Sequence, residues 1–344
     1  MKIILDAMGG DLAPNAIVQG ALDALKDFPV TIALVGREEA IRSAVKAAGY
    51  DAVPERLEIR NAPDVVDMHD APEKVLKQHP ESSMVLGLRQ LAAGEGDAFI
   101  SAGSTGALLT AATLVVKRIK GIRRAALCPT IPLQDGPLAL IDCGANAECT
   151  PEFLYQFAFM GSFYAKRFLN MEEPRVALLN NGTEDTKGTD LQKQTYAQLR
   201  QADEKGLLRF VGNIEAREAM LGGCDVLVTD GFTGNIFLKT VEGTAKYFSN
   251  SLKSIFGASL KTKIGALLTM KGIKNLKKQM DYRETGGTLF LGITKPVIKA
   301  HGSSDARAIY SSVRQAIQAV ESGVTDEIAA NMDQVRSVGS ETSA

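Results

Sequence analysis

The sequence contains no uninterrupted apolar run long enough to cross a membrane, and its first residues lack the charged-then-apolar layout of a signal peptide. It has only three histidines, and its four cysteines show no C-x-x-C spacing. In a chain of 344 residues such cysteines are typical of reduced thiols, and a zinc site needs a His/Cys cluster that the sequence lacks. We therefore expect a cytoplasmic protein without disulfides and without a bound metal.

Nucleotide-binding signatures are also missing. No Gly-Lys-Ser or Gly-Lys-Thr follows a glycine-rich loop, which excludes a P-loop, and no dinucleotide fingerprint joins a strand to a helix. No basic motif with interleaved aromatic residues is present, which argues against DNA or RNA as a partner. The sequence therefore predicts no cofactor and no nucleic-acid partner.

Strand-like and helix-like stretches alternate along the chain. Because strands separated by helices of ten or more residues form parallel sheets, we expect an α/β fold with a mostly parallel sheet and helices on both faces. The expected strands are residues 2–5, 31–35, 57–60, 98–101, 125–128, 138–141, 175–179, 207–211, 226–228 and 296–299. The expected helices are residues 15–26, 38–48, 104–117, 151–170, 189–204 and 303–320. Residues 1–336 would form one catalytic unit, and residues 337–344 a flexible tail with little to pack.

Six apolar, strand-like runs end on a small polar turn, and this pattern says most about function. The turns are residues 6–11, 101–106, 142–146, 180–183, 229–235 and 301–304. The carboxyl ends of parallel strands are where α/β sheets bind ligands, and small residues there allow backbone N–H groups to approach an anion. We expect the six turns to converge on one crevice that handles phosphate-like groups.

The 101–106 turn has the composition of a phosphate-binding loop. Ser104, Thr105 and Gly106 offer two hydroxyls and exposed N–H groups where a helix is expected to begin. Gly9 and Gly10 would let the first turn approach the same anion. A tight strand-to-helix turn that requires glycine explains the 101–106 sequence equally well.

Polar residues in the later turns are candidates for catalysis. Asn180 and Lys187 follow a strand-like run, and a lysine there would stabilise charge that grows in the transition state. Asp230 offers a base or a hydrogen-bond acceptor, and Asn235 an amide donor. His301 ends another strand and is a candidate to protonate a leaving group. The alternatives are a solvated polar loop, a helix-capping aspartate and a structural histidine.

Cys143 is a candidate nucleophile in the sequence Asp-Cys-Gly-Ala-Asn. No motif ties a histidine to it, and an activated thiolate needs such a partner. We therefore expect a buried, inert thiol.

Two segments are strongly basic. Residues 117–124 hold five cations, of which Lys117, Arg118, Arg123 and Arg124 would dock an acidic partner or neutralise a helix C-terminus. Residues 251–280 carry seven lysines and no acid, which leaves 32 basic and 40 acidic residues elsewhere.

Apolar residues at helical spacing accompany these lysines, and Gly257, Gly265 and Gly272 interrupt any single long helix. Short amphipathic helices with one basic side suit an anionic membrane surface. We expect residues 251–283 to form a basic, amphipathic helical excursion. Its membrane-contacting residues would be Leu260, Ile264, Leu267, Leu268, Lys271, Ile273 and Leu276.

At its six turns the sequence resembles the bacterial phosphate acyltransferases of phospholipid synthesis, which make acyl phosphate from acyl-ACP and inorganic phosphate. The resemblance spans residues 1 to about 320 and rests on Ile-Leu-Asp-Ala-Met-Gly-Gly-Asp11, Ser-Ala-Gly-Ser-Thr-Gly-Ala107, Ile-Asp-Cys-Gly-Ala-Asn146, Asn-Asn-Gly-Thr-Glu-Asp-Thr-Lys-Gly188, Val-Thr-Asp-Gly-Phe-Thr-Gly-Asn235 and His-Gly-Ser-Ser304. It implies a fold similar to the isocitrate and isopropylmalate dehydrogenases and the phosphotransacetylases, with a cleft between two lobes. It also implies a homodimer, loosely attached to the membrane, that passes its product to a glycerol-3-phosphate acyltransferase.

The resemblance implies direct attack of phosphate on the thioester of a long-chain acyl-ACP. Phosphate is already a competent nucleophile, so the protein would supply mainly positioning and charge stabilisation. The alternatives on the same fold are a short-chain phosphotransacetylase that uses acyl-CoA and an NAD-dependent, metal-assisted dehydrogenase. The dehydrogenase would need substrate arginines and metal-binding aspartates, which the sequence does not place. A non-catalytic membrane adaptor would leave the six turns unexplained.

Overall fold

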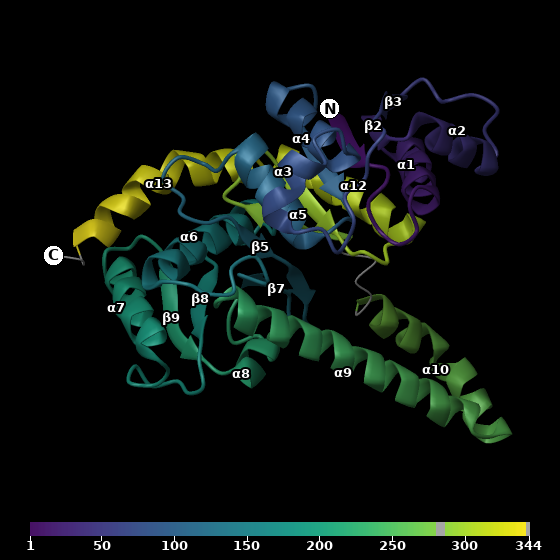
Figure 1. Ribbon diagram of the computed structural model, residues 1–344. Helices are drawn as coiled ribbons and strands as arrows, with labels where there is room; N and C mark the ends of the chain where they lie inside the picture. Colours follow the sequence, from purple (N-terminus) through teal and green to yellow (C-terminus); the bar gives the residue numbers. More distant parts are fainter. Residues whose placement is uncertain (280–285, 342–344) are drawn as a thin grey trace.

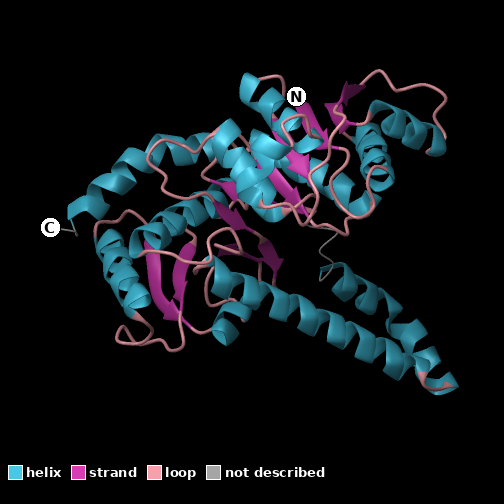
Figure 2. Ribbon diagram, viewed as in Figure 1, coloured by secondary structure: helices cyan, strands magenta, loops and turns pink. Residues whose placement is uncertain are grey.

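A computed structural model of the chain describes residues 1–279 and 286–341 and contains two β-sheets flanked by helices (Figure 1). We name the seven-stranded sheet with its helices the first lobe, and the five-stranded sheet with its helices the second lobe. Figure 2 shows how helices surround the strands of both sheets. The expected α/β class with mostly parallel strands is therefore confirmed, although the strands form two sheets where the sequence suggested one.

The sheet of the first lobe has the strand order β3-β2-β1-β4-β12-β11-β5. All neighbours are parallel except β11, which is antiparallel to both β12 and β5. The strands β1, β4 and β12 are parallel neighbours, so the turns that follow them leave from one edge of the sheet. The strands are β1 (Lys2–Asp6), β2 (Thr31–Gly36), β3 (Leu57–Asn61), β4 (Ala98–Ser101), β5 (Ala126–Cys128), β11 (Gly287–Leu291) and β12 (Val297–Ala300).

The sheet of the second lobe has the order β6-β7-β10-β8-β9, and only β6 is antiparallel to its neighbour. The turns after β7, β10 and β8 therefore also leave from one edge. The strands are β6 (Thr130–Pro132), β7 (Pro137–Ile141), β8 (Arg175–Leu179), β9 (Arg209–Ile214) and β10 (Val226–Val228).

Both faces of the first sheet are buried, as is usual for parallel strands. Ile3 and Leu5 lie in the apolar cluster that includes α1 (Asn15–Asp27) and α12 (Ala306–Glu321). Ile4 and Phe99 lie in the cluster on the opposite face. Further helices of this lobe are α2 (Glu38–Ala47), the 3-10 turn η1 (Pro72–Lys74), α3 (Val75–Gln78), α4 (Ser83–Ala93) and α5 (Thr105–Ala111).

One apolar core continues through both lobes, because the cluster that holds Ile3 also holds Phe157 and Val226. Phe157 belongs to α6 (Pro151–Arg167), which packs on the second sheet and on α13 (Val324–Glu341). Gly161 permits this packing, since a Cβ there would lie 2.6 Å from Cγ1 of Val226. The remaining helices of the second lobe are α7 (Asp190–Glu204) and α8 (Ala216–Met220).

Helices α9 (Gly231–Gly257) and α10 (Leu260–Gln279) form an arm that projects from the body (Figure 1). At 1.5 Å per residue, α9 is roughly 40 Å long. Its buried residues are Gly231, Gly234 and Phe237, all in the first two turns, so the rest of the helix has no core to pack on. None of the helices in the described part of the chain is long and apolar enough to cross a membrane.

The arm differs from the helical excursion that the sequence suggested. It begins at Gly231, twenty residues before the expected start, because α9 continues outward from the turn after β10. Gly257 is the last residue of α9 and so interrupts the helix as expected. Gly265 and Gly272 do not, because both lie inside α10. A glycine weakens a helix interior by only about 1 kcal/mol, which a 20-residue helix tolerates.

Two helix ends also differ from expectation. The helix expected over residues 104–117 is α5 followed by a π-helical turn, η2 (Ala112–Val116), and it ends where Lys117 takes a φ of 78°. Helix α13 runs to Glu341, although a flexible tail was expected from residue 337. Its buried residues Val324, Ile328, Met332 and Val335 fall on one face, which anchors the helix up to the start of that segment.

Candidate active site

Three turns of the first lobe meet in space, and the buried carboxylate of Asp6 fastens two of them. Asp6 ends β1 and accepts hydrogen bonds from Oγ of Ser101 (2.7 Å) and Oγ of Ser83 (2.6 Å). Burial raises the pKa of Asp6, while these hydrogen bonds favour the charged form. Ser101 also accepts the N–H of Gly103 (3.0 Å), so the turns after β1 and β4 form one unit.

Glycines let the turns after β1, β4 and β12 touch. The backbone N–H of Asp11 donates to the carbonyl of Gly302 (2.8 Å). Gly10 has a φ of +99°, and a side chain there would begin 3.0 Å from that same carbonyl. A Cβ at Gly9 would lie 2.8 Å from the backbone nitrogen of Gly103. Backbone from three distant parts of the sequence therefore lines one small region.

Hydroxyls without partners lie in the same turns. Oγ of Ser304 is buried and has no hydrogen-bond partner among the described residues. Ser104 precedes α5 and is only 9% exposed, yet its side chain makes no capping hydrogen bond. Thr105 and Gly106 follow half-buried, and Gly106 packs against Pro72. Buried polar groups in folded proteins are normally paired, so these hydroxyls leave hydrogen-bonding capacity for a ligand.

Two turns of the second lobe, which follow β7 and β10, also meet. Asp142 is buried, and its Oδ1 accepts the N–H groups of Leu127 (2.8 Å) and Cys143 (2.7 Å). Its Oδ2 accepts the N–H of Asn146 (2.6 Å), and the carbonyl of Asn146 accepts the N–H of Gly231 (2.8 Å). Burial raises the pKa of Asp142 against these hydrogen bonds. The carboxylate organises the turn on which α9 begins.

Asp230 caps α9, which is the structural alternative that the sequence left open. Its Oδ1 accepts the N–H of Thr233 and its Oδ2 accepts Oγ1 of the same residue, each at 2.8 Å. Asn235 lies one turn further along α9 and is exposed. Its Cγ is 3.7 Å from where a Cβ would stand on Gly144. Within the described chain the Asn235 amide has no hydrogen-bond partner, so it faces the turn after β7 with donors to offer.

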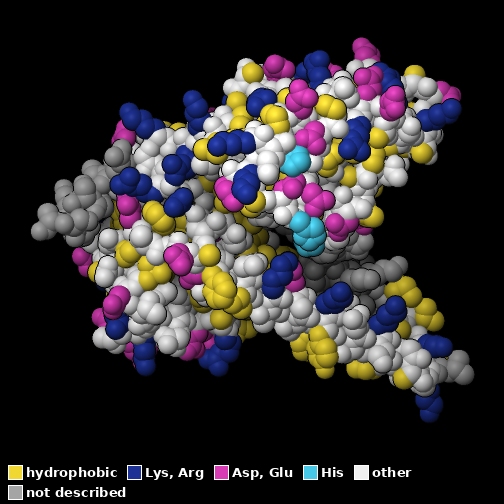
Figure 3. All heavy atoms as spheres, viewed as in Figure 1, with side chains coloured by type: hydrophobic (Ala, Val, Ile, Leu, Met, Phe, Trp, Pro, Cys, Tyr) yellow, Lys and Arg dark blue, Asp and Glu magenta, His cyan; other side chains and the backbone are white. Residues whose placement is uncertain are grey.

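Helix α9 brings a cation from the second lobe toward His301 in the first. Burial lowers the pKa of His301, and the charges of Lys239 and Lys299 lower it further. Burial likewise lowers the pKa of Lys299 to about 8, and Lys239 adds to that effect. Lys239 lies one turn beyond Asn235 and pairs with Glu242 (2.7 Å). Figure 3 shows a hollow between the first lobe and the arm, with Lys and Arg side chains along the arm.

Asn180 and Lys187 follow a strand that neighbours this region, but among the described residues they form no polar contact with the residues of the region. The strand β8 neighbours β10, with Leu178 opposite Val228, so Asn180 begins its turn one strand away. The amide of Asn180 donates to the carbonyl of Lys187 (3.2 Å). Lys187 is exposed, and its aliphatic chain packs on Gly182. Over the described ranges, no hydrogen bond or ion pair joins either residue to the other five turns.

The cysteines near the site are protonated thiols. Burial raises the pKa of Cys143 to about 12, and the nearby Asp142 raises it further. Its Sγ donates to the carbonyl of Gly234 (3.6 Å). Burial also raises the pKa of Cys149 to about 12. Cys143 is thus buried, as the sequence suggested.

No group of three or more His, Cys, Asp or Glu side chains in the described residues could hold a metal ion. Nδ1 of His301 lies 2.9 Å from Oγ of Ser303, two residues along the same turn. The region where the turns meet therefore offers backbone N–H groups, hydroxyls, amides, a histidine and lysines. Groups of these kinds are suited to binding anions and to polarising carbonyl groups.

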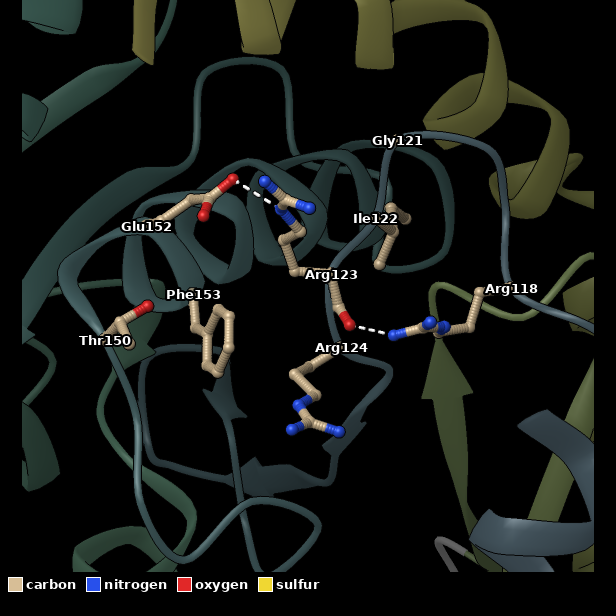
Figure 4. A pocket seen from close by; sticks show the side chains of 8 residues that line it. All are labelled: Arg118, Gly121, Ile122, Arg123, Arg124, Thr150, Glu152 and Phe153. Atoms are coloured by element: carbon tan, nitrogen blue, oxygen red, sulfur yellow. Dashed lines mark hydrogen bonds and ion pairs between the residues drawn. The ribbon is translucent and has the colours of Figure 1, made fainter. Parts of the chain in front are cut away.

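A cavity of about 670 Å³ lies beside the basic segment 117–124, which we name the basic loop (Figure 4). Three of the four residues expected to dock an acidic partner line it, and Lys117 does not. Arg123 pairs with Glu152 (2.8 Å), and the Arg124 guanidinium lies 5.6 Å from the centre of the Phe153 ring. The full lining is Arg118, Gly121, Ile122, Arg123, Arg124, Thr150, Glu152 and Phe153.

The outer part of the arm exposes apolar side chains. Ile264, Leu267 and Leu268 are 57%, 64% and 83% exposed on α10. Lysines 261 and 263 are exposed on the same helix. The other residues expected to contact a membrane lie outside the residues whose side chains are described; they are Leu260, Lys271, Ile273 and Leu276.

Four residues of this site were not singled out from the sequence. Asp6 and Ser304 stand inside the quoted turn motifs, and a buried carboxylate or hydroxyl at a strand end was the available signal. Lys299 looked like an ordinary strand residue, and only burial distinguishes it. Lys239 follows Asn235 by four positions, which places the two on one face of a helix.

The whole chain matches known proteins. A protein family described as "Fatty acid synthesis protein" matches residues 1–327. A phosphate acyltransferase from Caldanaerobacter subterraneus subsp. tengcongensis is 44% identical over 329 residues, which cover 95% of this chain and 96% of the relative. One from Streptococcus pneumoniae is 46% identical over 331 residues, which cover 95% and 98%.

Solved structures share the fold at low sequence identity. A phosphotransacetylase from Streptococcus pyogenes has a TM-score of 0.63 and 18% identity, covering 93% of this chain and 94% of that one. A putative 4-hydroxythreonine-4-phosphate dehydrogenase from Salmonella typhimurium has a TM-score of 0.52 and 14% identity, covering 92% and 99%. The expected likeness to phosphotransacetylases and dehydrogenases is therefore confirmed at the level of fold. By its sequence match over nearly its full length, the chain belongs to the phosphate acyltransferase family of fatty acid synthesis proteins.

Proposed function

We propose that the protein transfers a long-chain acyl group from acyl-ACP to inorganic phosphate, forming acyl phosphate for glycerol-3-phosphate acylation. Membership of the family supports phosphate acyltransferase activity. The observation that carries the site is the meeting of the turns after β1, β4 and β12. There Gly10 closely approaches Gly302, and the buried Ser304 hydroxyl has no hydrogen-bond partner in the described part of the chain. Small residues and unpaired hydroxyls of this kind suit a phosphate oxyanion.

In the proposed reaction, a phosphate oxygen attacks the thioester carbonyl carbon, the C–S bond breaks and the thiol of the carrier leaves. Ser104, Thr105 and Gly106, with Gly9 and Gly10, would hold the phosphate. Binding both reactants side by side supplies most of the rate enhancement, since phosphate needs little activation.

The remaining roles concern charge and the proton. Asn235 and Asn180 would polarise the thioester carbonyl, and two lysines, Lys187 and Lys239 of α9, would offset negative charge. Both oxygens of Asp230 are already engaged by Thr233, which favours His301 over Asp230 for the proton that reaches the leaving thiolate. Burial and neighbouring cations lower the pKa of His301, which favours its neutral imidazole, so His301 would accept the proton that the phosphate loses and pass it to the thiolate.

The decisive experiment incubates the purified protein with palmitoyl-ACP and radiolabelled phosphate. We expect a labelled, lipid-soluble acyl phosphate whose formation requires both substrates. Activity with acetyl-CoA and none with palmitoyl-ACP would instead identify a short-chain phosphotransacetylase. Reduction of NAD in the presence of Mg²⁺, without thioester cleavage, would identify a dehydrogenase.

Two partners follow from the charge distribution. An acidic acyl carrier would dock on Lys117, Arg118, Arg123 and Arg124, all of which are exposed. The arm would contact an anionic membrane surface, where an acyl phosphate partitions, and the protein would otherwise be cytoplasmic. A homodimer and a contact with a membrane glycerol-3-phosphate acyltransferase are proposed from the family resemblance.

Replacing Leu267 and Leu268 together by glutamine is expected to weaken binding to anionic vesicles at least about 10-fold, because each buried leucine contributes about 1.5–3 kcal/mol. Both side chains are more than half exposed, so the folded protein should keep its stability. Co-sedimentation with vesicles that contain anionic lipid measures the effect. Leu221→Gln is the control, since Leu221 is 70% exposed but follows α8 in the body. Equal loss in both proteins would contradict a membrane role for the arm.

A further inference from the structure

The backbone of the basic loop is anchored on both sides, which fixes the positions from which its cations extend. Ile119 and Ile122 are buried and anchor it to the core. Gln156 of α6 clamps it from the other side, because its Nε2 donates to the carbonyl of Gly121 (3.2 Å) and its Oε1 accepts the N–H of Arg123 (2.9 Å). A loop that was merely a solvated surface would not need these anchors.

The charges that line the cavity are unbalanced. Three arginines face one glutamate, and Glu152 is already paired with Arg123. Arg118 donates to the carbonyl of Arg123. The Arg124 guanidinium has no hydrogen bond or ion pair among the described residues and stacks on Phe153. In Figure 4, Arg124 and Phe153 extend together, away from the Arg123–Glu152 pair. The cavity thus combines an unpaired guanidinium with an apolar wall.

The cavity lies next to the turns proposed to carry the reaction. The amide of Asn146 donates to the carbonyl of Ala125 (2.9 Å), the residue after Arg124, and its backbone carbonyl accepts the N–H of Gly231 (2.8 Å). Burial raises the pKa of Cys149, and both Asp230 and Arg124 are close enough to shift it in opposite directions. Arg124 and the start of α9 are therefore separated by little more than one side chain.

We propose that this cavity binds the phosphate of the phosphopantetheine arm of the acyl carrier, with Arg124 as its principal ligand. The assignment rests on the proposed function. The phosphopantetheine arm has a phosphate at one end and the acyl-bearing sulfur at the other, so a phosphate on Arg124 would let the sulfur extend past the start of α9 toward Asn235. An arginine binds phosphate oxygens through charge-assisted, bidentate hydrogen bonds, and Phe153 suits the branched apolar part of the arm.

The test measures binding of 4′-phosphopantetheine and of pantetheine, which lacks the phosphate, to the full-length protein by calorimetry. We expect the wild type to bind the phosphorylated compound at least about 10-fold more tightly, and Arg124→Gln to lose most of this preference. Lys120→Gln is the matched control, because Lys120 is an exposed cation of the same loop that does not line the cavity. It should keep the preference.

An unchanged preference in Arg124→Gln, or none in the wild type, would overturn the assignment. Coenzyme A carries the same phosphopantetheine phosphate as the carrier. To distinguish the two sources, KM of the wild type and of Arg124→Gln is measured with palmitoyl-ACP and with palmitoyl-CoA. A higher KM for palmitoyl-ACP in Arg124→Gln supports the carrier as the source of the phosphate. A rise confined to palmitoyl-CoA would overturn the assignment to the carrier. Because calorimetry needs no turnover, a preference without acyl phosphate formation would refute the proposed function and leave the binding site standing.

Discussion

Replacing Lys239 by methionine is expected to lower the rate of acyl phosphate formation about 100-fold, the cost of removing one group that stabilises transition-state charge. Lys239 comes from the second lobe, yet its charge reaches His301, Lys299 and Cys143. These electrostatic effects indicate that Lys239 lies near groups of both lobes. Its ion pair with Glu242 is half-exposed and contributes at most about 1 kcal/mol, so folding should be little affected.

Initial rates over a range of phosphate concentrations, with thermal unfolding in parallel, measure this effect. NMR titration of His301 adds a readout of position: removal of a nearby cation should raise the pKa that this cation lowers. Lys246→Met, which removes an exposed lysine further along α9, is the control. Loss of activity in Lys187→Met with full activity in Lys239→Met would show that Lys187, and not Lys239, stabilises the charge.

The strands could be located from sequence because apolar runs end sharply on Asp, Ser or Gly. The sequence predicts β4, β8 and β10 with their observed ends, since each is a short buried run between polar residues. It misses β6 and β11. The first is a three-residue edge strand that ends in proline, and the second begins at Gly287, where Ile298 of β12 leaves no room for a side chain. Only β6 lacks a local signal, since residues 288–291 of β11 form an apolar run that the sequence analysis did not use.

Helix α9 could not be predicted as one element, because a helix is detected by its buried stripe and most of α9 has none. The arrangement of the site could likewise be predicted only in part from the sequence. That turns at strand ends lie near one another follows from a parallel sheet, but the order β1-β4-β12, which joins residues 6–11 to residues 301–304, is set by long-range pairing. The role of Lys239 depends on the direction in which α9 extends from the turn after β10. Tertiary packing sets that direction, so local sequence does not predict it.

Replacing Gly234 by alanine is expected to destabilise the protein by about 3 kcal/mol and to abolish most of its activity. A Cβ at Gly234 would lie 2.0 Å from the carbonyl oxygen of Asp142 and 2.9 Å from Cγ2 of Thr229. The first of these atoms is backbone, held by the hydrogen bonds of the buried Asp142 carboxylate, so α9 must move away. That movement would displace Asn235 and Lys239 from the facing turns.

Gly243→Ala provides the matched comparison on the same helix. Nothing lies within 4 Å of a Cβ there, and alanine in a helix interior is favoured over glycine by about 0.5–1 kcal/mol, so this variant should be slightly more stable. Urea unfolding and rates of acyl phosphate formation are measured for both proteins. If Gly234→Ala unfolded at the same urea concentration as Gly243→Ala, the close contact between α9 and the turn after β7 would be wrong. If Gly234→Ala were destabilised but fully active, α9 would not position the reacting groups, and the proposed role of Lys239 would be wrong.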